Sequence, residues 1–275
     1  MQEHASALLI SDLHLTPSMP LTAQRFFDFV EKEANQVESV FILGDLFEYW
    51  VGDDAGARSP FQQEVLRALS RLSSKAKTYY IHGNRDFLIG EQFIRKSGMT
   101  LLPDPSKVMI AGDEWVISHG DALCTNDLSY QIFRKWVRKP WLQNLFLRLP
   151  LEWRRGIART LRTNSTAKYD RAVRYTPEMA RFKGDVTLVA CANLMGSYSS
   201  ERLIHGHTHL PARHHESMGN SLGRKGVFQG ADHRLLPDQI GKSRGAIFAR
   251  QNLITHWGSS DPLMDTYFLS KTSSN

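Results

Sequence analysis

Carboxylate and imidazole side chains that follow short apolar runs are the residues of this chain best placed to do chemistry. Asp12 and His14 come directly after the apolar run 7–10. Residues two apart in an extended chain point the same way, so this pair can hold one metal ion from two sides. Alone the pair is weak evidence, because an ordinary loop after a strand often contains the same residue types.

The same arrangement recurs along the chain, and the recurrence gives it weight. Four later apolar runs are each followed by such residues: Asp45 after 40–43, Asn84 after 78–81, His119 after 115–117, and His207 and His209 after 202–204. Glycine accompanies most of them, and Gly44 lets the backbone turn sharply just before Asp45. Each residue alone could be a turn former, but coincidence explains five such places poorly.

Seven of these residues form the expected set of metal ligands: Asp12, His14, Asp45, Asn84, His119, His207 and His209. Seven ligands cannot surround one ion and leave room for a substrate, so we expect two ions that share Asp45 as a bridge. Carboxylate, amide and imidazole without thiolate favour Mn²⁺, Fe²⁺ or Zn²⁺. Two such ions suit hydrolysis of phosphoesters and phosphoanhydrides, in which a bridging water loses a proton and attacks in line. Arg85 is expected to neutralise charge on the phosphoryl oxygens, whereas His82 and His205 are expected to be core histidines.

Alternating strands and helices are expected to position this site. Apolar residues at helical spacing predict one helix from Thr22, which can cap it, to about 36, and another from Pro60 to about 72 with Ser59 as its cap. Two further strands are expected at 108–110 and 115–117. The alternation favours an α/β fold, in which functional residues gather where the strands end.

The composition is that of a globular protein, with 275 residues, of which 41% are hydrophobic and 23% charged. Two cysteines, Cys124 and Cys191, give no disulfide framework and favour a reducing compartment. The N-terminus lacks the pattern of a secretory signal, and no apolar run approaches the roughly 20 residues of a membrane span. We therefore expect a single domain, 1–275, in the cytoplasm.

The net charge of +6 is concentrated in the segment 134–162, where nine basic residues oppose one acidic residue. Bulky apolar residues alternate with these cations and predict two short amphipathic helices separated by Pro150. Their expected apolar faces are Trp141, Leu142, Leu145, Phe146 and Leu149 in the first, and Trp153, Ile157 and Leu161 in the second. Such faces either pack on the protein's own core or house acyl chains and rest on an anionic membrane, and the arginines favour the membrane.

Five short blocks, 12–14, 44–45, 83–84, 119–121 and 206–209, resemble the calcineurin-like metallophosphoesterases. The resemblance implies an α/β fold, a four-layer sandwich of two mixed β-sheets flanked by helices, with a helical cap insertion at about 127–200. It implies one ion on Asp12, His14, Asp45 and His209, and another on Asp45, Asn84, His119 and His207. It also implies that Asn84, Arg85 and His119 are the catalytic residues.

A narrower resemblance, carried by 44–54, 87–90, 97–103 and 139–143, is to the enzymes that cleave UDP-2,3-diacylglucosamine in lipid A biosynthesis. It implies cleavage to UMP and 2,3-diacylglucosamine 1-phosphate, with two Mn²⁺ ions as the expected cofactors. Many calcineurin-like enzymes have His where this chain has Arg85, and a sugar phosphate leaving group has more use for a fixed cation than for an acid. The implied substrate contacts are Asn84, Arg85, Asp127, Ser165, Lys168 and His207. The segments 171–200 and 226–232 depart from the pattern.

Two other functions stay open at this stage. The first is a related phosphodiesterase acting on nucleotides or nucleic acid, since Lys/Arg clusters also bind phosphate backbones; the apolar bulk among the arginines counts against it, and no nucleic-acid partner is expected. The second is a non-catalytic membrane-binding relative, although all seven ligands are present. The expected partners are UDP-2,3-diacylglucosamine and the anionic inner-membrane surface, with the protein peripheral on its cytoplasmic face through 134–162. The tail 270–275 is expected to be disordered.

Overall fold

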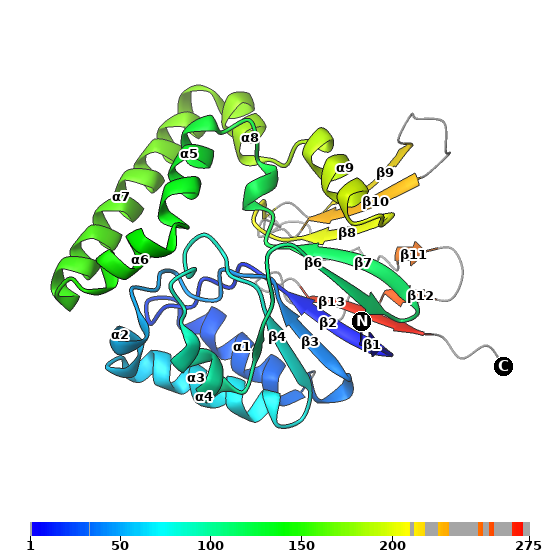
Figure 1. The fold of residues 1–275 in the computed structure, drawn as a ribbon, viewed down its shortest axis with the longest axis horizontal. Helices are drawn as coiled ribbons and strands as arrows, with labels where there is room; N and C mark the ends of the chain where they lie inside the picture. The colour runs from blue at the N-terminus through cyan, green and yellow to red at the C-terminus, as the bar shows by residue number, and fades with distance from the viewer. Residues whose placement is uncertain are drawn as a thin grey trace.

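Two β-sheets stacked face to face form the body of the molecule (Figure 1). A computed structural model describes residues 2–32, 34–209, 212–217, 225–230, 247–249, 253–255 and 266–271. One sheet has the strand order β11-β12-β13-β2-β3-β4-β5 and the other β1-β6-β7-β8-β10-β9. The strands are β1 (Glu3–His4), β2 (Ser6–Ile10), β3 (Ser39–Ile42), β4 (Lys77–Tyr80), β5 (Thr100–Leu101), β6 (Ser106–Ile110), β7 (Asp113–Ser118), β8 (Arg202–His205), β9 (Ala212–Ser217), β10 (Lys225–Gly230), β11 (Ile247–Ala249), β12 (Leu253–Thr255) and β13 (Thr266–Lys271).

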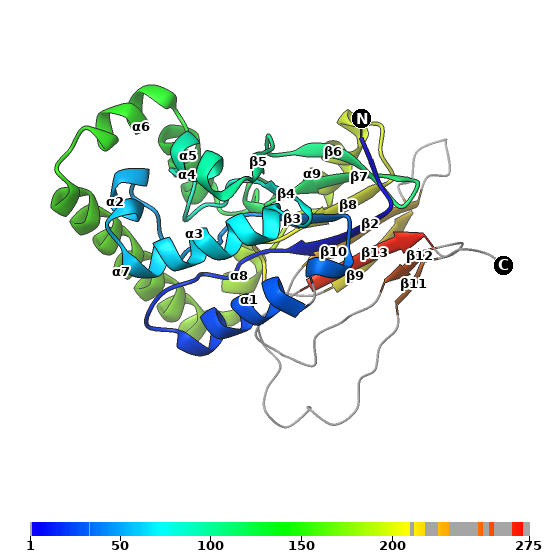
Figure 2. The same ribbon diagram turned by 90° about the horizontal axis from the view of Figure 1, so that it is seen from below.

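Helices cover the outer faces of both sheets, so the order of layers is helix, sheet, sheet, helix (Figures 1 and 2). Helices α1, α3 and α4 flank the seven-stranded sheet, and α9 packs on the six-stranded sheet through Cys191 and Met195. The helices are α1 (Pro20–Lys32), α2 (Asp53–Ala57), α3 (Pro60–Ser73), α4 (Glu91–Ser97), α5 (Leu128–Val137), α6 (Pro140–Leu147), α7 (Leu151–Tyr175), α8 (Pro177–Gly184) and α9 (Leu188–Ser197), with short 3-10 turns η1 (Ala34–Gln36) and η2 (Asp121–Leu123). The expected four-layer α/β sandwich is therefore confirmed.

The apolar runs that were expected to form strands are buried on both faces of the sheet. Along β2, Leu8 and Ile10 pack toward the helices, whereas Ala7 and Leu9 pack into the core between the sheets. Successive side chains of a strand point to opposite faces, so a strand covered on both sides needs a continuous apolar run. Strands β2, β3 and β4 are parallel neighbours, so their carboxyl ends meet at one edge of the sheet.

Two predicted helix boundaries were wrong. Helix α1 begins at Pro20, because proline is well tolerated in a first turn, and Thr22 is buried inside the helix instead of capping it. Helix α7 runs for 25 residues to Tyr175, far beyond the predicted short helix. Its apolar face ends near Leu161, but no helix breaker follows until Pro177, which disfavours helix at the residue before it.

Two further expectations had different outcomes. Ser59 caps α3, as expected, and its Oγ accepts a hydrogen bond from the Gln62 N–H at 3.3 Å. The expected disordered tail is wrong at its start, because residues 270 and 271 belong to β13; residues 272–275 lie outside the described part.

Helices α5 to α8 lie beside the sandwich, at one end of the sheets (Figure 1). They are inserted between β7 and β8, which are parallel neighbours in one sheet. Among the helices in the described ranges, none combines the length and the hydrophobicity of a transmembrane span.

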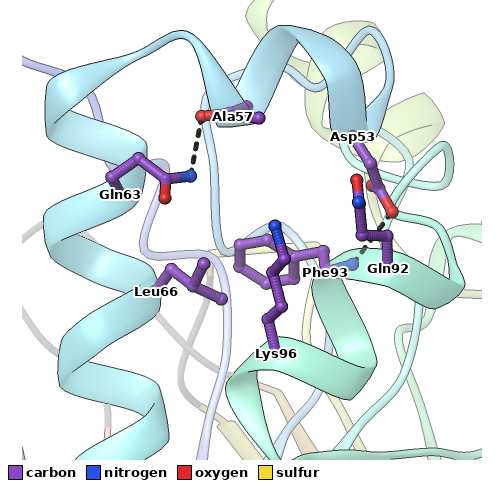
Figure 3. A pocket seen from close by; sticks show the side chains of 8 residues that line it. Asp53, Ala57, Gln63, Leu66, Gln92, Phe93 and Lys96 are labelled. Atoms are coloured by element: carbon purple, nitrogen blue, oxygen red, sulfur yellow. Dashed lines mark hydrogen bonds between the residues drawn. The ribbon is translucent and has the colours of Figure 1, made fainter.

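The loop after β3 is fastened to the helical layer (Figure 3). Asp53 accepts hydrogen bonds from the backbone N–H groups of Gly90 and Phe93, each at 2.9 Å, and Gln63 Nε2 donates to the Gly56 carbonyl at 3.0 Å. The cavity between these groups has a volume of about 10 Å³, room for one water at most. It is a packing gap, and it cannot hold a substrate.

Candidate metal centre

The seven predicted ligands come from five loops and meet where the two sheets adjoin. Three loops follow strands of the seven-stranded sheet: β2 leads to Asp12 and His14, β3 to Asp45, and β4 to Asn84. The other two follow β7 and β8 of the six-stranded sheet and carry His119, His207 and His209. The structure brings all seven together, with contributions from both sheets.

One group consists of Asp12, His14 and His209, whose ligand atoms lie within 4.8 Å of one another. The Nε2 atoms of His14 and His209 are 3.1 Å apart, and Asp12 Oδ1 is 3.9 Å from His209 Nε2. Within the described residues, the buried atoms Asp12 Oδ1 and His14 Nδ1 have no hydrogen-bond partner. Buried polar atoms without partners cost free energy, and a cation would satisfy them.

The second group consists of Asp45, His119 and His207, again within 4.8 Å. Asn84 Oδ1 joins it, at 2.9 Å from both His119 Nε2 and His207 Nδ1. His119 Nδ1 lies 2.8 Å from the Leu43 carbonyl oxygen, to which it can only donate. This contact leaves Nε2 of a neutral His119 ring with its lone pair toward the group, as a metal ligand needs.

The Asp45 carboxylate lies between the two groups. Its Oδ2 is 3.8 Å from His14 Nδ1, and its Oδ1 is 3.8 Å from His119 Nε2. One oxygen thus faces each group, which is the position that a bridging ligand requires. Arg85 adjoins the same carboxylate: its backbone N–H donates to Oδ1 at 2.9 Å, and its Nε is 3.4 Å from Oδ2.

The backbone is left-handed at most of these ligands. In the described residues, seven non-glycine residues have a positive φ, and five of them are predicted ligands: Asp12, His14, Asp45, His207 and His209. Such conformations cost on the order of 1 kcal/mol each and cluster at functional sites. The sequence gives no direct signal of this strain.

The glycines beside the ligands are required for close approach. A Cβ on Gly83 would lie 2.1 Å from Asp45 Oδ1, and one on Gly206 would lie 2.5 Å from Asp12 Oδ2. A Cβ on Gly44 would lie 2.7 Å from His119 Nδ1. The sequence suggested turns at these glycines; the structure adds that no side chain fits there.

The electrostatics of the centre favour a cation. Burial raises the pKa of Asp45 to about 7, against the pull of His119. Burial alone would lower the pKa of His119, but the carboxylates of Asp45 and Asp12 raise it to about 9. Burial and the neighbouring His119 lower the pKa of His207 to about 4. The buried carboxylates thus favour a protonated His119, whereas His207 stays neutral. A divalent cation bound between these groups would compensate the negative charge of the carboxylates.

Two buried carboxylates that sequence reasoning missed hold the ligand loops. Asp86 accepts backbone N–H groups from two loops, among them Leu46 at 2.7 Å and Gly83 at 3.0 Å, and so joins the loops of Asp45 and Asn84. Its signal was an Asp two residues after Asn84, just beyond the block 83–84.

The other missed carboxylate is Asp121, which ties the loop of His119 to α5. Its Oδ2 accepts hydrogen bonds from the Tyr130 hydroxyl at 2.5 Å and from Arg134 Nε at 2.8 Å. Burial would raise the pKa of Asp121, but His119 and Arg134 hold it well below its usual range. The charged carboxylate therefore persists inside the protein.

The predicted contacts to the sugar lie on α5 and α7. Asp127 caps α5 by accepting from the Tyr130 N–H at 3.1 Å, and Lys168 Nζ donates to Ser129 Oγ at 3.1 Å, next to Asp127. Ser165 is exposed on α7, three residues before Lys168. In the described contacts, Asp127 and Lys168 come close together, whereas none joins them or Ser165 to the metal-binding groups.

The two histidines expected in the core contact backbone. His82 Nε2 lies 2.8 Å from the Ile89 carbonyl oxygen, and the buried His205 has Nδ1 3.0 Å from the Gly206 carbonyl oxygen. These contacts are those of structural histidines, and neither residue belongs to the two candidate metal-binding groups.

The amphipathic segment 134–162 leaves much of its apolar surface exposed. Trp141 is 57% and Trp153 is 66% exposed, so these side chains do not pack on the core. A shallow groove of about 440 Å³ runs along α7, lined by Trp153, Gly156, Ile157, Thr160 and Leu161.

Several of the arginines that favoured a membrane contact are instead used inside the protein. Arg154 is buried and donates to both Asp54 oxygens and to the Val51 carbonyl. Arg134 and Arg162 bind acidic side chains next to the metal-binding loops. The segment is therefore less cationic at its surface than its sequence suggested.

Comparison with known proteins gives consistent matches. The model of the family described as calcineurin-like phosphoesterase matches residues 6–211. A UDP-2,3-diacylglucosamine hydrolase of Ralstonia nicotianae is 46% identical over 213 residues, 76% of this chain and 79% of the relative. Proteins of the same name from Ectopseudomonas mendocina and Escherichia coli are 43% and 42% identical, over 79% and 83% of this chain and 87% and 91% of their own lengths.

Proposed function

This chain belongs to the calcineurin-like phosphoesterase family, and on that basis we propose that it is a metal-dependent hydrolase of the pyrophosphate bond of UDP-2,3-diacylglucosamine. The products are UMP and 2,3-diacylglucosamine 1-phosphate. The observation that carries the proposal is the Asp45 carboxylate, which presents one oxygen to each of two groups of ligand atoms. The names of the relatives supply the substrate.

The residues fit two divalent ions, which we assign as Mn²⁺. Asp12, His14, Asp45 and His209 would hold one ion, and Asp45, Asn84, His119 and His207 would hold the other. Oxygen and nitrogen donors without thiolate suit this metal. When bound, the ions would activate water and polarise the phosphoryl oxygens.

The protein's own residues orient the ligands and stabilise the charge that develops on the substrate. The His119 ring is held by the Leu43 carbonyl in the orientation that keeps Nε2 toward the site. The Arg85 guanidinium, 18% exposed, supplies fixed positive charge beside Asp45, where negative charge develops on the phosphoryl group. Asn84 Oδ1 lies 2.9 Å from a ring nitrogen of both His119 and His207, where it would serve beside them as a ligand of the same ion. A sugar phosphate is a good leaving group, so no general acid is needed.

The helices beside the sandwich supply the selectivity for a lipid. Asp127, Ser165 and Lys168 are proposed to bind the glucosamine part. The shallow apolar groove along α7, about 440 Å³ and open to solvent, is proposed to contact the acyl chains through exposed Trp153 and Ile157. Lys168 Nζ contacts Ser129, which in turn donates to Asp127, so these polar side chains form one connected group.

The reaction is tested by measuring UMP release from UDP-2,3-diacylglucosamine by the Mn²⁺-treated protein, beside cleavage of an aryl phosphodiester. We expect release that a chelator abolishes and that His119→Ala loses. Cleavage of the diester without UMP release would keep the metal centre and reject the lipid substrate. A Lys75→Ala variant, changed at an exposed residue after α3, is the control and should release UMP as the wild type does.

We further propose that the protein rests peripherally on the cytoplasmic face of the inner membrane through 134–162. Exposed Trp141 and Trp153 support this contact, and the remaining exposed cations would attract anionic lipid. Co-sedimentation with vesicles of phosphatidylglycerol should exceed that with phosphatidylcholine, and Trp153→Asp should weaken it. If the protein binds neither kind of vesicle, the membrane contact is rejected and the apolar surface is limited to a role in substrate binding.

A further inference from the structure

Glu48, three residues after Asp45, is held by two arginines from different parts of the chain. Arg85 Nη1 donates to Glu48 Oε2 at 2.6 Å. Arg162, which comes from α7, donates through Nε to Glu48 Oε1. One carboxylate thus carries one guanidinium on each of its oxygens, and it links the helices beside the sandwich to the catalytic edge.

Both arginines adjoin the loop of Asp45. Arg85 is 3.4 Å from the Asp45 carboxylate, as described above. Arg162 contacts Glu48, three residues after Asp45 in the same loop. The side chains of Glu48, Arg85 and Arg162 are 23%, 18% and 37% exposed, so an anion from solvent can reach them.

A carboxylate between two guanidiniums occupies the place that a phosphoryl group would take. Arginine presents its donors in a planar fork that matches the oxygens of either anion. A pyrophosphate has two phosphoryl groups, and only one of them can be the reacting group over the ligand atoms. The other also carries charge, so a cation in addition to Arg85 is needed to bind it.

We propose that Arg162 is a specificity-determining residue that, together with Arg85, binds the second phosphoryl group of the pyrophosphate, and that Glu48 holds both guanidiniums until the substrate replaces it. This inference rests on the proposed function, since it names the part of the substrate that the two cations recognise. It explains how a metal centre suited to many phosphoesters would select a pyrophosphate. It also means that the ion pair between Arg162 of α7 and Glu48 is replaced by a contact between Arg162 and the substrate.

Binding of UDP and of UMP to the Mn²⁺-loaded protein, measured by calorimetry, tests this proposal without turnover of the lipid. UDP carries a second phosphoryl group and UMP lacks it, while the rest of the two molecules is the same. Arg162→Gln should weaken UDP binding about tenfold and UMP binding less than twofold, since a hydrogen bond to a charged group is worth about a factor of ten. Arg162→Lys should recover part of the loss.

The matched control is Arg155→Gln, on the same helix. Arg155 also forms an ion pair, with Glu152 at 2.7 Å, but with a partner on its own helix. It should leave the ratio of UDP to UMP affinity unchanged. Glu48→Gln removes the competing carboxylate and should strengthen UDP binding severalfold while leaving UMP binding nearly constant.

Three results would overturn the proposal. They are a wild-type protein that binds UDP no more tightly than UMP, an Arg162→Gln variant that loses both ligands equally, and a Glu48→Gln variant with unchanged UDP affinity. The last variant decides the matter alone if Arg162→Gln does not fold. The proposed function fails separately, by the absence of UMP release from UDP-2,3-diacylglucosamine, so the two failures are distinguishable.

Discussion

Replacing Gly83 by alanine should disable the metal centre while leaving most of the fold intact. An added Cβ would lie 2.1 Å from Asp45 Oδ1 and 2.2 Å from the Asp45 backbone nitrogen. Ordinary contact begins at 3.4 Å, so one of the two loops must move by about 1.3 Å. Asp45 Oδ1 is held by the Arg85 N–H and the second neighbour is backbone, so the shift falls on the proposed bridging ligand.

The size of the effect follows from that displacement. A misplacement of about 1 Å at a reacting centre costs roughly a hundredfold in rate. Forcing a methyl group into a packed site costs about 1–3 kcal/mol of stability, which a domain of this size can tolerate. We therefore expect a folded Gly83→Ala protein with weakened Mn²⁺ binding and roughly a hundredfold lower rate of UMP release.

Gly196→Ala provides the matched control. Gly196 lies within α9, and a Cβ there meets nothing within 4 Å. Alanine in a helix interior is about 0.5–1 kcal/mol more stable than glycine, so this variant should unfold at a slightly higher temperature and keep its metal and activity. Calorimetric Mn²⁺ titration, thermal unfolding and UMP release measured on both variants are the assay. A Gly83→Ala protein with the Mn²⁺ affinity and turnover of the wild type would refute the close packing described here.

Three further predictions concern charge. Metal binding needs a neutral His119, and the pKa of His119 in the metal-free protein is about 9. Mn²⁺ binding should therefore release a proton, and the Mn²⁺ affinity should rise with pH up to about 9. An affinity that is constant between pH 6.5 and 8.5 would contradict this. Arg154→Met leaves acceptors at Asp54 and two carbonyls without their donor and should cost about 2–3 kcal/mol in urea unfolding, whereas Arg155→Met should cost under about 0.5. Asp121→Asn should loosen α5 and lower the free energy of unfolding above pH 4. The pKa of Asp121 is depressed in the folded protein, so its stabilisation is present above its unfolded pKa and fades as the pH falls further; equal stability of the variant and the wild type at pH 7 would count against it.

The sequence predicted the α/β fold and the convergence of the seven candidate ligands, because strands and the polar residues that follow them are visible as local patterns. An apolar run buried on both faces identifies a strand, and a polar residue directly after it marks the strand's end. These patterns located the loops of Asp12, Asp45 and His119 without information on distant contacts. They did not show that the ligands come from both sheets.

Features that depend on contacts between distant segments were not predictable. Asp86 and Asp121 look like ordinary loop acids until the loops that they join are placed beside them. The arginines of 134–162 looked like a membrane-facing cluster, since nothing in the sequence shows that Arg154 and Arg162 meet acids about 100 residues away. Helix α7 was predicted too short, because its second half has no apolar face to reveal it.

The most direct test of the account is UMP release from UDP-2,3-diacylglucosamine, followed as Mn²⁺ is titrated into the metal-stripped protein with bound metal measured in parallel. The account predicts no release from the stripped protein, release that saturates near two ions per chain, and loss of the second ion and of release in Asp45→Ala. Release that persists without metal, or full release by Asp45→Ala, would contradict it.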